Sequence, residues 1–146
     1  MSIAVASDHA GFELKKQILE YFAQQNIACK DLGTFTDQPV DYPDFGVQTA
    51  KEVVAGNHPF GIIICGTGIG ISISANKIDG ARAALCCNEY MAEMARKHNN
   101  ANILALGGRT TTIDIAVRII EVFLHTDFAG GRHAERVAKI HALTGR

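Results

Sequence analysis

Short apolar runs alternate along the chain with segments in which apolar residues recur every three or four positions. Ile62, Ile63 and Ile64 form a continuous apolar run with the length of a buried parallel strand. The pattern predicts five strands, at Ile3–Ala6, at Ala28–Asp31, over the run that ends at Cys65, at Arg82–Cys86 and at Ile103–Leu106.

Helices are predicted in the segments between these strands. One begins at about Gly11, with Leu14, Ile18 and Phe22 on a single face. Asp37–Asp44 contains two prolines and is expected to be a loop, followed by a helix that ends at Val54. Further helices are predicted after Gly70, over Tyr90–Lys97, across the apolar face of Ile113, Ala116, Val117, Ile120, Phe123 and Leu124, and, after Gly130–Gly131, over about Arg132–Leu143.

This alternation predicts a doubly wound α/β fold, a flavodoxin-like or Rossmann-like αβα sandwich that forms a single domain over residues 1–146. With strands numbered in chain order, we expect a five-stranded parallel sheet of order 2-1-3-4-5 and an added C-terminal helix. In that order the first and third strands end side by side, where such folds bind ligands. The residues that follow these two strands are Ser7–His9 and Cys65–Gly70.

Composition narrows the class of protein. The chain has 47% apolar residues and 14 Lys and Arg against 15 Asp and Glu, so it lacks the basic excess of a nucleic-acid-binding domain. We find neither an apolar run long enough to span a membrane nor a signal-peptide pattern in Met1–Asp8, so we expect a cytoplasmic chain without a membrane partner. The four cysteines fit no zinc spacing and are expected to be free thiols: Cys29, Cys65, Cys86 and Cys87.

Phe60–Asn76 reads as a buried strand, a cysteine, a glycine loop and a helix start. Gly66, Gly68 and Gly70 allow a sharp turn that brings several main-chain N–H groups together, a site for an anionic oxygen. Such donors favour the thiolate of Cys65, which can then act as a base or a nucleophile. The alternative is a tight strand–helix turn beside a small buried cysteine.

Two familiar phosphate-binding motifs do not fit this loop. A dinucleotide fingerprint needs its third glycine at position 71, which is Ile71 here. A Walker loop needs Gly-Lys followed by Ser or Thr, which the loop does not contain. If the loop holds an anion, it does so without either motif.

Asp8, His9 and Thr67 are the polar residues expected beside this loop. Asp8 precedes a helix and is explained as its N-cap, whereas His9 would face the crevice with an ionisable ring. Thr67 is either a turn residue or the donor of a hydroxyl to a substrate oxygen.

His98, Asn99 and Asn100 follow a predicted helix, where they are ordinary stop signals. A crossover helix runs antiparallel to its strands, so its end lies at the opposite edge of the sheet from Cys65. If His98 acts on the same ligand as Cys65, it comes from a second subunit. The active site would then lie across a dimer interface.

Three arginines are candidates for binding a phosphate group. Arg132 and Arg136 are four residues apart at the start of the last predicted helix, so both project from one face. They form either a phosphate clamp or a solvated basic face. Arg109, directly after Gly107-Gly108, is the third candidate.

Five blocks cover nearly the whole chain in order: SDHAG (Ser7–Gly11), DYPDF (Asp41–Phe45), ICGTGIGISISANK (Ile64–Lys77), ARKHNNANILALGGR (Ala95–Arg109) and GGRHAERV (Gly130–Val137). Together they resemble type B ribose-5-phosphate isomerase, of the wider sugar-phosphate isomerase family that includes the galactose-6-phosphate isomerase subunits. The resemblance implies a homodimer, sometimes a tetramer, that needs no metal or organic cofactor. It also implies interconversion of the sugar phosphates D-ribose 5-phosphate and D-ribulose 5-phosphate in pentose phosphate metabolism.

The resemblance assigns roles position by position. Cys65 would be the base that takes the C2 proton, and Thr67 with the loop amides would hold the enediolate oxygen. His98, with Asp8 as a candidate partner, would assist opening of the sugar ring. The substrate-binding positions implied are Asp8, His9, Gly66, Thr67, Gly68, Ile69, Gly70, Asn99, Arg109, Arg132 and Arg136.

One branch of the family places a Glu base where this chain has Ile71, so the role of the base is expected to fall to Cys65 here.

Two alternative functions stay open at this point. An isomerase for a 6-phosphate hexose, such as allose or galactose 6-phosphate, fits the same residues. A nucleotide- or phosphate-binding regulatory module on the same fold would explain the glycine loop, but would leave Cys65 and His98 without a role.

Overall fold

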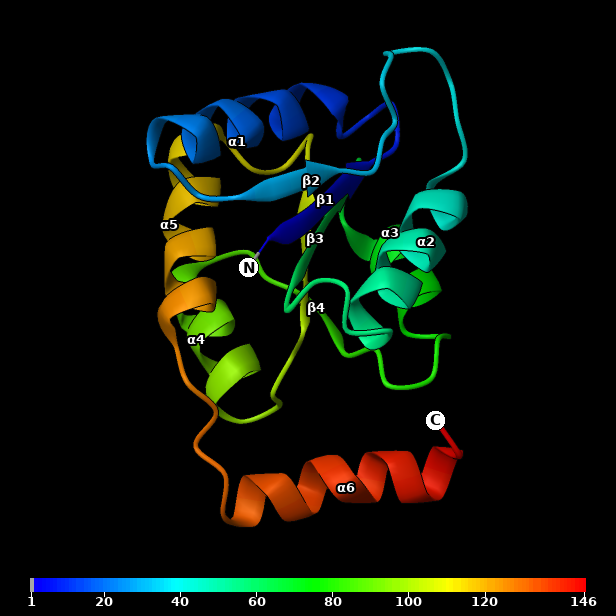
Figure 1. Cartoon of the computed structure of the whole chain (residues 1–146), viewed down its shortest axis with the longest axis vertical. Coiled ribbons are helices and arrows are strands. Elements are labelled where there is room, and N and C mark those ends of the chain that lie inside the picture. Colours follow the sequence, from blue (N-terminus) through cyan, green and yellow to red (C-terminus); the bar gives the residue numbers. More distant parts are fainter. Residues whose placement is uncertain (1) are drawn as a thin grey trace.

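The computed structural model describes residues 2–146 and has a parallel sheet between two helical layers (Figure 1). The strands are β1 (Ile3–Ser7), β2 (Cys29–Asp31), β3 (Gly61–Cys65), β4 (Ala83–Leu85) and β5 (Ile103–Gly107). The helices are α1 (Phe12–Gln24), α2 (Tyr42–Val54), α3 (Ile69–Ala75), α4 (Glu89–Lys97), α5 (Ile113–His125) and α6 (Arg132–Thr144). The predicted α/β class and every predicted element are therefore confirmed, with small shifts in their bounds.

The sheet order is β2-β1-β3-β5-β4, so the predicted position of the last two strands was wrong. All five residues of β5 are buried, which suits a strand between two neighbours, whereas the three residues of β4 are half-buried and suit an edge. The predicted order 2-1-3-4-5 would have placed the short, half-buried β4 between two neighbouring strands. The pairing of β1 with β3, on which the expected crevice depends, is confirmed.

The corrected order changes the layer to which α4 belongs. Right-handed crossovers place helices on opposite faces when the chain reverses its direction across the sheet. The chain steps outward from β3 to β4 and back to β5, so α3 packs with α2, and α4 packs with α5 on the face of α1 (Figure 1). The core of this second layer includes Ile18, Phe22, Ile119 and Phe123, all fully buried.

Helices α2 and α3 begin earlier than the sequence predicted. Helix α2 begins at Tyr42, inside the expected loop, with Pro43 in its first turn, where a missing N–H group costs no hydrogen bond. Helix α3 begins at Ile69 and not after Gly70, because Gly68 adopts a left-handed conformation and ends the turn sooner. Both starts lie at the edge of the sheet where the strands end.

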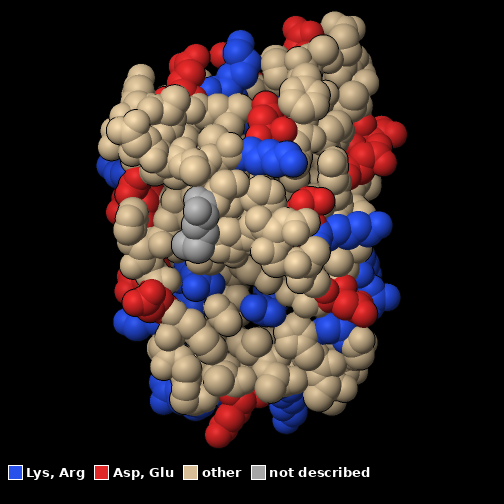
Figure 2. Space-filling model, viewed as in Figure 1, with Lys and Arg blue, Asp and Glu red and all other residues tan. Residues whose placement is uncertain are grey.

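Helix α6 lies apart from the two layers, across the end of the molecule where the strands begin (Figure 1). Only Val137 of this helix is buried among the described residues, and Leu143 is 76% exposed. A hollow of about 570 Å³ separates α6 from the body of the fold, and its walls include Arg82, Asn99 and His141. Both signs of charge are interspersed over one face, with several Lys and Arg side chains above α6 (Figure 2).

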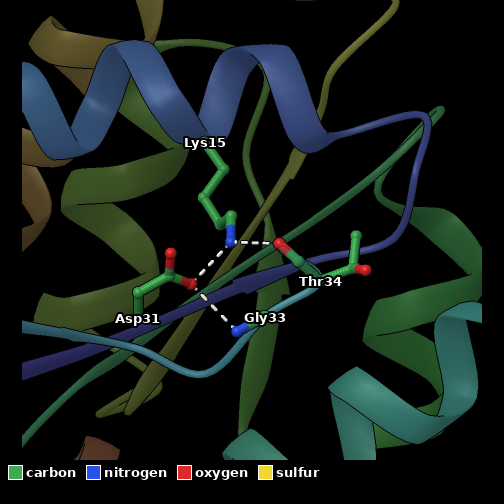
Figure 3. Close-up of polar contacts among 4 residues, drawn as sticks. All are labelled: Lys15, Asp31, Gly33 and Thr34. Carbon is green, nitrogen blue, oxygen red and sulfur yellow. Dashed lines mark hydrogen bonds and ion pairs between the residues drawn. The ribbon is translucent and has the colours of Figure 1, made fainter. Parts of the chain in front are cut away.

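A buried lysine joins α1 to the turn that follows β2 (Figure 3). Lys15 is fully buried, and its Nζ donates to Asp31 Oδ1 at 2.5 Å and to the carbonyl oxygen of Thr34 at 2.6 Å. The same carboxylate oxygen accepts the Gly33 N–H at 2.9 Å. Because Ser7 N–H donates to the Gly33 carbonyl, this turn is held against the end of β1.

Within residues 2–146, no helix is long and apolar enough to span a bilayer.

Candidate active site

The ends of β1 and β3 bring the two predicted polar segments together. Ser7 pairs with Ile64 in the parallel register, and the next N–H along the chain, that of Asp8, donates to the Ile64 carbonyl at 3.1 Å. Each strand then leads into a turn and a helix, as expected at a switch point of the sheet. The Asp8–His9 segment therefore lies directly beside the Cys65–Gly70 loop.

Cys65 closes β3 with its sulfur beneath the glycine loop. Its Sγ accepts a hydrogen bond from the Gly68 N–H at 3.2 Å, and the residue is 4% exposed. Gly68 has φ +80°, and a Cβ at this position would lie 2.6 Å from the Leu85 side chain. Glycine is therefore required at position 68, because this conformation aims the N–H at the sulfur.

The main-chain N–H groups from Ile69 to Ile71 differ in their hydrogen-bond acceptors. The Ile69 N–H donates to the Thr67 hydroxyl at 3.2 Å, so this threonine shapes the turn. The amides of Gly70 and Ile71 precede the first main-chain hydrogen bond of α3, from the Ser72 N–H to the Gly68 carbonyl. N–H groups in this position are the ones that a helix leaves for an external acceptor.

Arg109 lies against the same loop from the turn after β5. Its N–H donates to the Gly66 carbonyl at 3.0 Å, and its guanidinium contacts Gly66, where an added Cβ would lie 3.3 Å from Nη1. The side chain is exposed and carries a positive charge to the rim of the site. Of the three candidate arginines, this is the one that the fold places beside Cys65.

Asp8 and His9 occupy the opposite side of the crevice. Asp8 is 5% exposed, and its Oδ1 accepts the Gly11 N–H at 3.0 Å. Its predicted place as the N-cap was wrong, because a turn separates Asp8 from α1 and Gly11 is the N-cap. His9 Nδ1 lies 3.1 Å from both the N–H and the carbonyl oxygen of Val40. The main chain of Val40 thus engages Nδ1 in either tautomer, so Nε2 is the ring nitrogen left for another group.

Tyr42 also belongs to this site and was not among the predicted site residues. Its ring lies over Gly70, so closely that a Cβ at Gly70 would fall 2.6 Å from the ring. Tyr42 also shares the walls of an open hollow of about 510 Å³ with Asp8 and His9. The block DYPDF contained the signal, but only the folded chain shows that its tyrosine reaches the glycine loop.

A second polar cluster forms at the opposite edge of the sheet, where the strands begin. The turn after α4 lies there, since Asn102 accepts the N–H of Gly61, the first residue of β3, at 3.0 Å. The ring of His98 stacks on that of His133, with centroids 4.2 Å apart and an angle of 8° between the planes. Asn99 is exposed in the same turn, and Arg132 and Arg136 project from the start of α6.

The charges of this second cluster act on one another. The pKa of His133 is lowered by desolvation first, and then by the positive groups around it. Those groups are His98, Arg132, Arg136 and Lys97. Lys97 pairs with Glu93 at 3.7 Å, whereas Arg132 and Arg136 make no ion pair among the described residues. Two such guanidinium groups favour an anion such as phosphate.

One chain therefore does not unite the predicted site residues. Asp8, His9, Arg109 and the loop from Cys65 to Gly70 share one edge of the sheet, whereas His98, Asn99, Arg132 and Arg136 share the other. The separation follows from the direction of α4, which descends beside the strands (Figure 1).

Of the remaining thiols, Cys86 and Cys29 are buried or half-buried, and Cys87 is exposed. Cys86 is buried, and burial, with a smaller effect of Cys87, raises its pKa to about 12. Burial likewise raises the pKa of Cys29, with Asp31 adding to the effect. Within residues 2–146, no three His, Cys, Asp or Glu side chains converge as they would to hold a metal ion.

Comparisons with known proteins show which family the chain resembles. The family model described as Ribose/Galactose Isomerase matches residues 3–140. Ribose-5-phosphate isomerase B of Escherichia coli strain K12 is 41% identical over 144 residues, which cover 99% of this chain and 97% of that protein.

Two solved structures are also similar. Ribose-5-phosphate isomerase B of Clostridium thermocellum superposes with a TM-score of 0.97 at 49% identity, covering 99% of this chain and 98% of that one. The enzyme of Mycoplasma genitalium, solved with bound ribulose-5-phosphate, has a TM-score of 0.92 at 41% identity, covering 99% and 97% of the two chains.

Proposed function

The chain belongs to the ribose/galactose isomerase family, and from this premise we propose that it interconverts D-ribose 5-phosphate and D-ribulose 5-phosphate, with Cys65 as the base. The observation that carries the proposal is the contact of Cys65 Sγ with the Gly68 N–H, at the switch point of the sheet. A sulfur held in this way can hold negative charge and accept a proton.

The chemistry requires one base and one site for negative charge. In the aldose-to-ketose direction the thiolate of Cys65 takes the proton from C2, and the C2–H electron pair forms the enediolate as the C1 carbonyl oxygen becomes negative. The amides of the loop, with Thr67, stabilise that oxygen. The thiol then returns its proton to C1, and the proton of O2 passes to O1. O2 thereby becomes the new carbonyl oxygen and O1 the C1 hydroxyl, so no external oxidant or reductant is needed.

The second cluster supplies the remaining steps in this proposal. The sugar arrives as a closed ring, and an imidazole near neutral pH, that of His98, can move the proton that opens it. Asn99 contacts a sugar hydroxyl, and Arg132 and Arg136 hold the phosphate. His9 and Arg109 border the reacting carbons from the side of Cys65.

Because the two clusters lie at opposite edges of one chain, the proposed site is completed by a second copy. Cys65 of one subunit faces His98 of its partner in a homodimer with two equivalent sites. Mixing Cys65→Ala and His98→Ala proteins under subunit exchange then restores about a quarter of the wild-type activity, because about half of the dimers are mixed and each has one intact site. Failure to restore activity despite exchange contradicts the sharing.

Turnover by purified, chelator-treated protein tests the proposed reaction. Ribose 5-phosphate is offered in deuterated water, and the ribulose 5-phosphate formed is examined for deuterium at C1. Turnover with at least partial incorporation supports proton transfer through the sulfur, since the proton on a thiol exchanges with solvent. Allose 6-phosphate and galactose 6-phosphate serve as the comparison substrates, and a faster rate on either overturns the assignment to a pentose phosphate.

A further inference from the structure

Arg96 is a buried arginine that the proposed reaction does not use. It lies near the end of α4, two residues before His98, and is 8% exposed. Its guanidinium lies over the ring of Phe60 at 4.8 Å and over that of Phe123 at 5.7 Å. Burying a charge is costly, so its contacts deserve an explanation beyond packing.

The polar contacts of Arg96 reach two segments that are distant in the sequence. Nη1 donates to the carbonyl oxygen of Ala101 at 2.6 Å and to Asn100 Oδ1 at 3.0 Å, both in the turn after α4. Nε donates to the carbonyl oxygen of Thr126 at 3.3 Å, in the linker between α5 and α6. A planar fork of donors suits this task, whereas a lysine offers a single point charge.

These two segments carry the second polar cluster. The turn holds His98 and Asn99, and the linker leads to His133 at the start of α6. They are joined once more by the Ala129 N–H, which donates to the Lys97 carbonyl at 3.0 Å. The stacked rings of His98 and His133 therefore lie at the ends of two segments that one guanidinium ties together.

Elsewhere, helix α6 is held mainly near its C-terminal end, where Arg82 Nη1 lies 3.2 Å from His141 Nε2 and Arg146 Nη1 donates to the Lys77 carbonyl. Val137 is its one buried residue among those described, and the hollow of about 570 Å³ lies beneath its second half. The contacts of Arg96 and of the Ala129 N–H hold the linker, which leads into the first turn of α6, against the end of α4.

We propose that Arg96 is a positioning residue that holds the turn after α4 and the linker before α6 together, so that His98 and the start of α6 face the substrate as one unit. The inference rests on the proposed function, because it assigns Arg96 to the half of the shared site that contains His98 and faces Cys65 of the other subunit.

The test compares two mixed dimers, each with Arg96→Lys in a different one of its two chains. The chain with Cys65→Ala supplies His98 to the one intact site, and the chain with His98→Ala supplies Cys65. We expect Arg96→Lys to lower kcat/KM by about 10- to 100-fold in the first chain and by less than about twofold in the second. Arg118→Lys, an exposed substitution on α5, is the matched control and leaves the rate unchanged in either chain.

A role in general folding makes different predictions. An equal loss from either chain, or no loss from either, overturns the proposal, provided that circular dichroism shows the variants to be folded. Only a loss confined to the chain that supplies His98 supports it.

A second measurement does not depend on how the site is shared. Stacked imidazoles shift each other's ring protons upfield, so the NMR signals of His98 and His133 report their contact. We expect Arg96→Lys to reduce this shift and Arg118→Lys to preserve it. If the mixed dimers recover no activity, the shared site fails, and an unchanged ring shift then overturns the role of Arg96 separately.

Discussion

The sulfur of Cys65 accepts a hydrogen bond from the main-chain N–H of Gly68, 3.2 Å away across a three-residue turn. This contact ties the last residue of β3 to Gly68, the N-cap of α3. It makes the hydrogen bond to the sulfur depend on the left-handed conformation of one glycine. The proposed base and the loop that supports it are therefore a single structural unit.

Replacing Cys65 with serine should nearly abolish isomerisation. A serine hydroxyl is a far weaker acid than a thiol and holds almost no negative charge at neutral pH, so we expect kcat to fall by at least about 10³-fold. Binding of a phosphate-bearing inhibitor should change little. Steady-state kinetics and calorimetry measure the two effects, and Cys87→Ser, at an exposed cysteine, is the control. Near-normal turnover in Cys65→Ser places the base elsewhere.

Gly68→Ala should damage both stability and activity. The new methyl group would lie 2.6 Å from Leu85 and 2.9 Å from the Leu106 carbonyl carbon, at a φ of +80° that alanine resists. We expect a loss of about 2–4 kcal/mol in the free energy of unfolding, with kcat falling as the N–H turns away from the sulfur.

Gly56→Ala is the matched control for this change, because Gly56 has φ +82° with no atom within 4 Å of the new methyl group. It should cost about 1 kcal/mol of stability and leave kcat unchanged. Equal kinetic effects of the two substitutions would contradict the link between Gly68 and catalysis.

Arg136→Ala should raise KM more than it lowers kcat. If this arginine binds the phosphate, far from the reacting carbons, its removal weakens substrate and transition state together. We expect KM to rise by about 10-fold or more, with kcat reduced by less than about threefold. Lys139→Ala, another exposed cation of α6, is the control. An unchanged KM removes Arg136 from the phosphate site.

Lys15→Met should destabilise the protein, whereas Lys16→Met should not. Removing Lys15 leaves the Asp31 carboxylate and the Thr34 carbonyl without their buried partner. Because Asp31 keeps some contact with water, we expect the free energy of unfolding to fall by about 2–4 kcal/mol, near the lower end of the range for breaking a buried ion pair. Lys16 makes an exposed ion pair with Glu13, worth less than about 1 kcal/mol. Urea unfolding measures both, and equal losses would contradict the importance of burial.

Ionisation of Tyr21 should lower the stability of the protein at alkaline pH. A hydrogen bond to Glu121, then burial and the charge of Glu121, raise the pKa of Tyr21 from 10.0 to about 12. The folded state thus binds this proton more tightly than the unfolded state, and the resulting stability is full below pH 10 and is lost as the pH rises toward 12. Tyr21→Phe should flatten the dependence in that range, and Tyr90→Phe, at an exposed ring, should not. Urea unfolding at about pH 9 and about pH 11.5 compares them.

Much of the fold could be predicted because its signals are local. The run Ile62–Ile64 and the spacing of Leu14, Ile18 and Phe22 gave a strand and a helix within a few residues of their true bounds. The placement of β4 at the edge could not be obtained in that way, since it depends on which strand best fills the centre of the sheet.

The candidate site divides along the same line. The Cys65–Gly70 loop and Asp8–His9 were predicted together, because parallel strands end at one edge of the sheet. Tyr42 was missed, since its contact with Gly70 arises when α2 packs beside α3. The stack of His98 on His133 joins residues 35 positions apart on two helices, and no local pattern encodes such a contact.

By itself, the sequence determined the alternation of strands and helices, the glycine loop after Cys65 and the motifs that identify the family, because each is a property of neighbouring residues. Tertiary structure alone decided the order of β4 and β5, the contact of Tyr42 with Gly70, and the stacking of His98 on His133. These depend on how buried apolar area is shared among elements that lie far apart in the chain, a balance that is settled only when all of them pack at once.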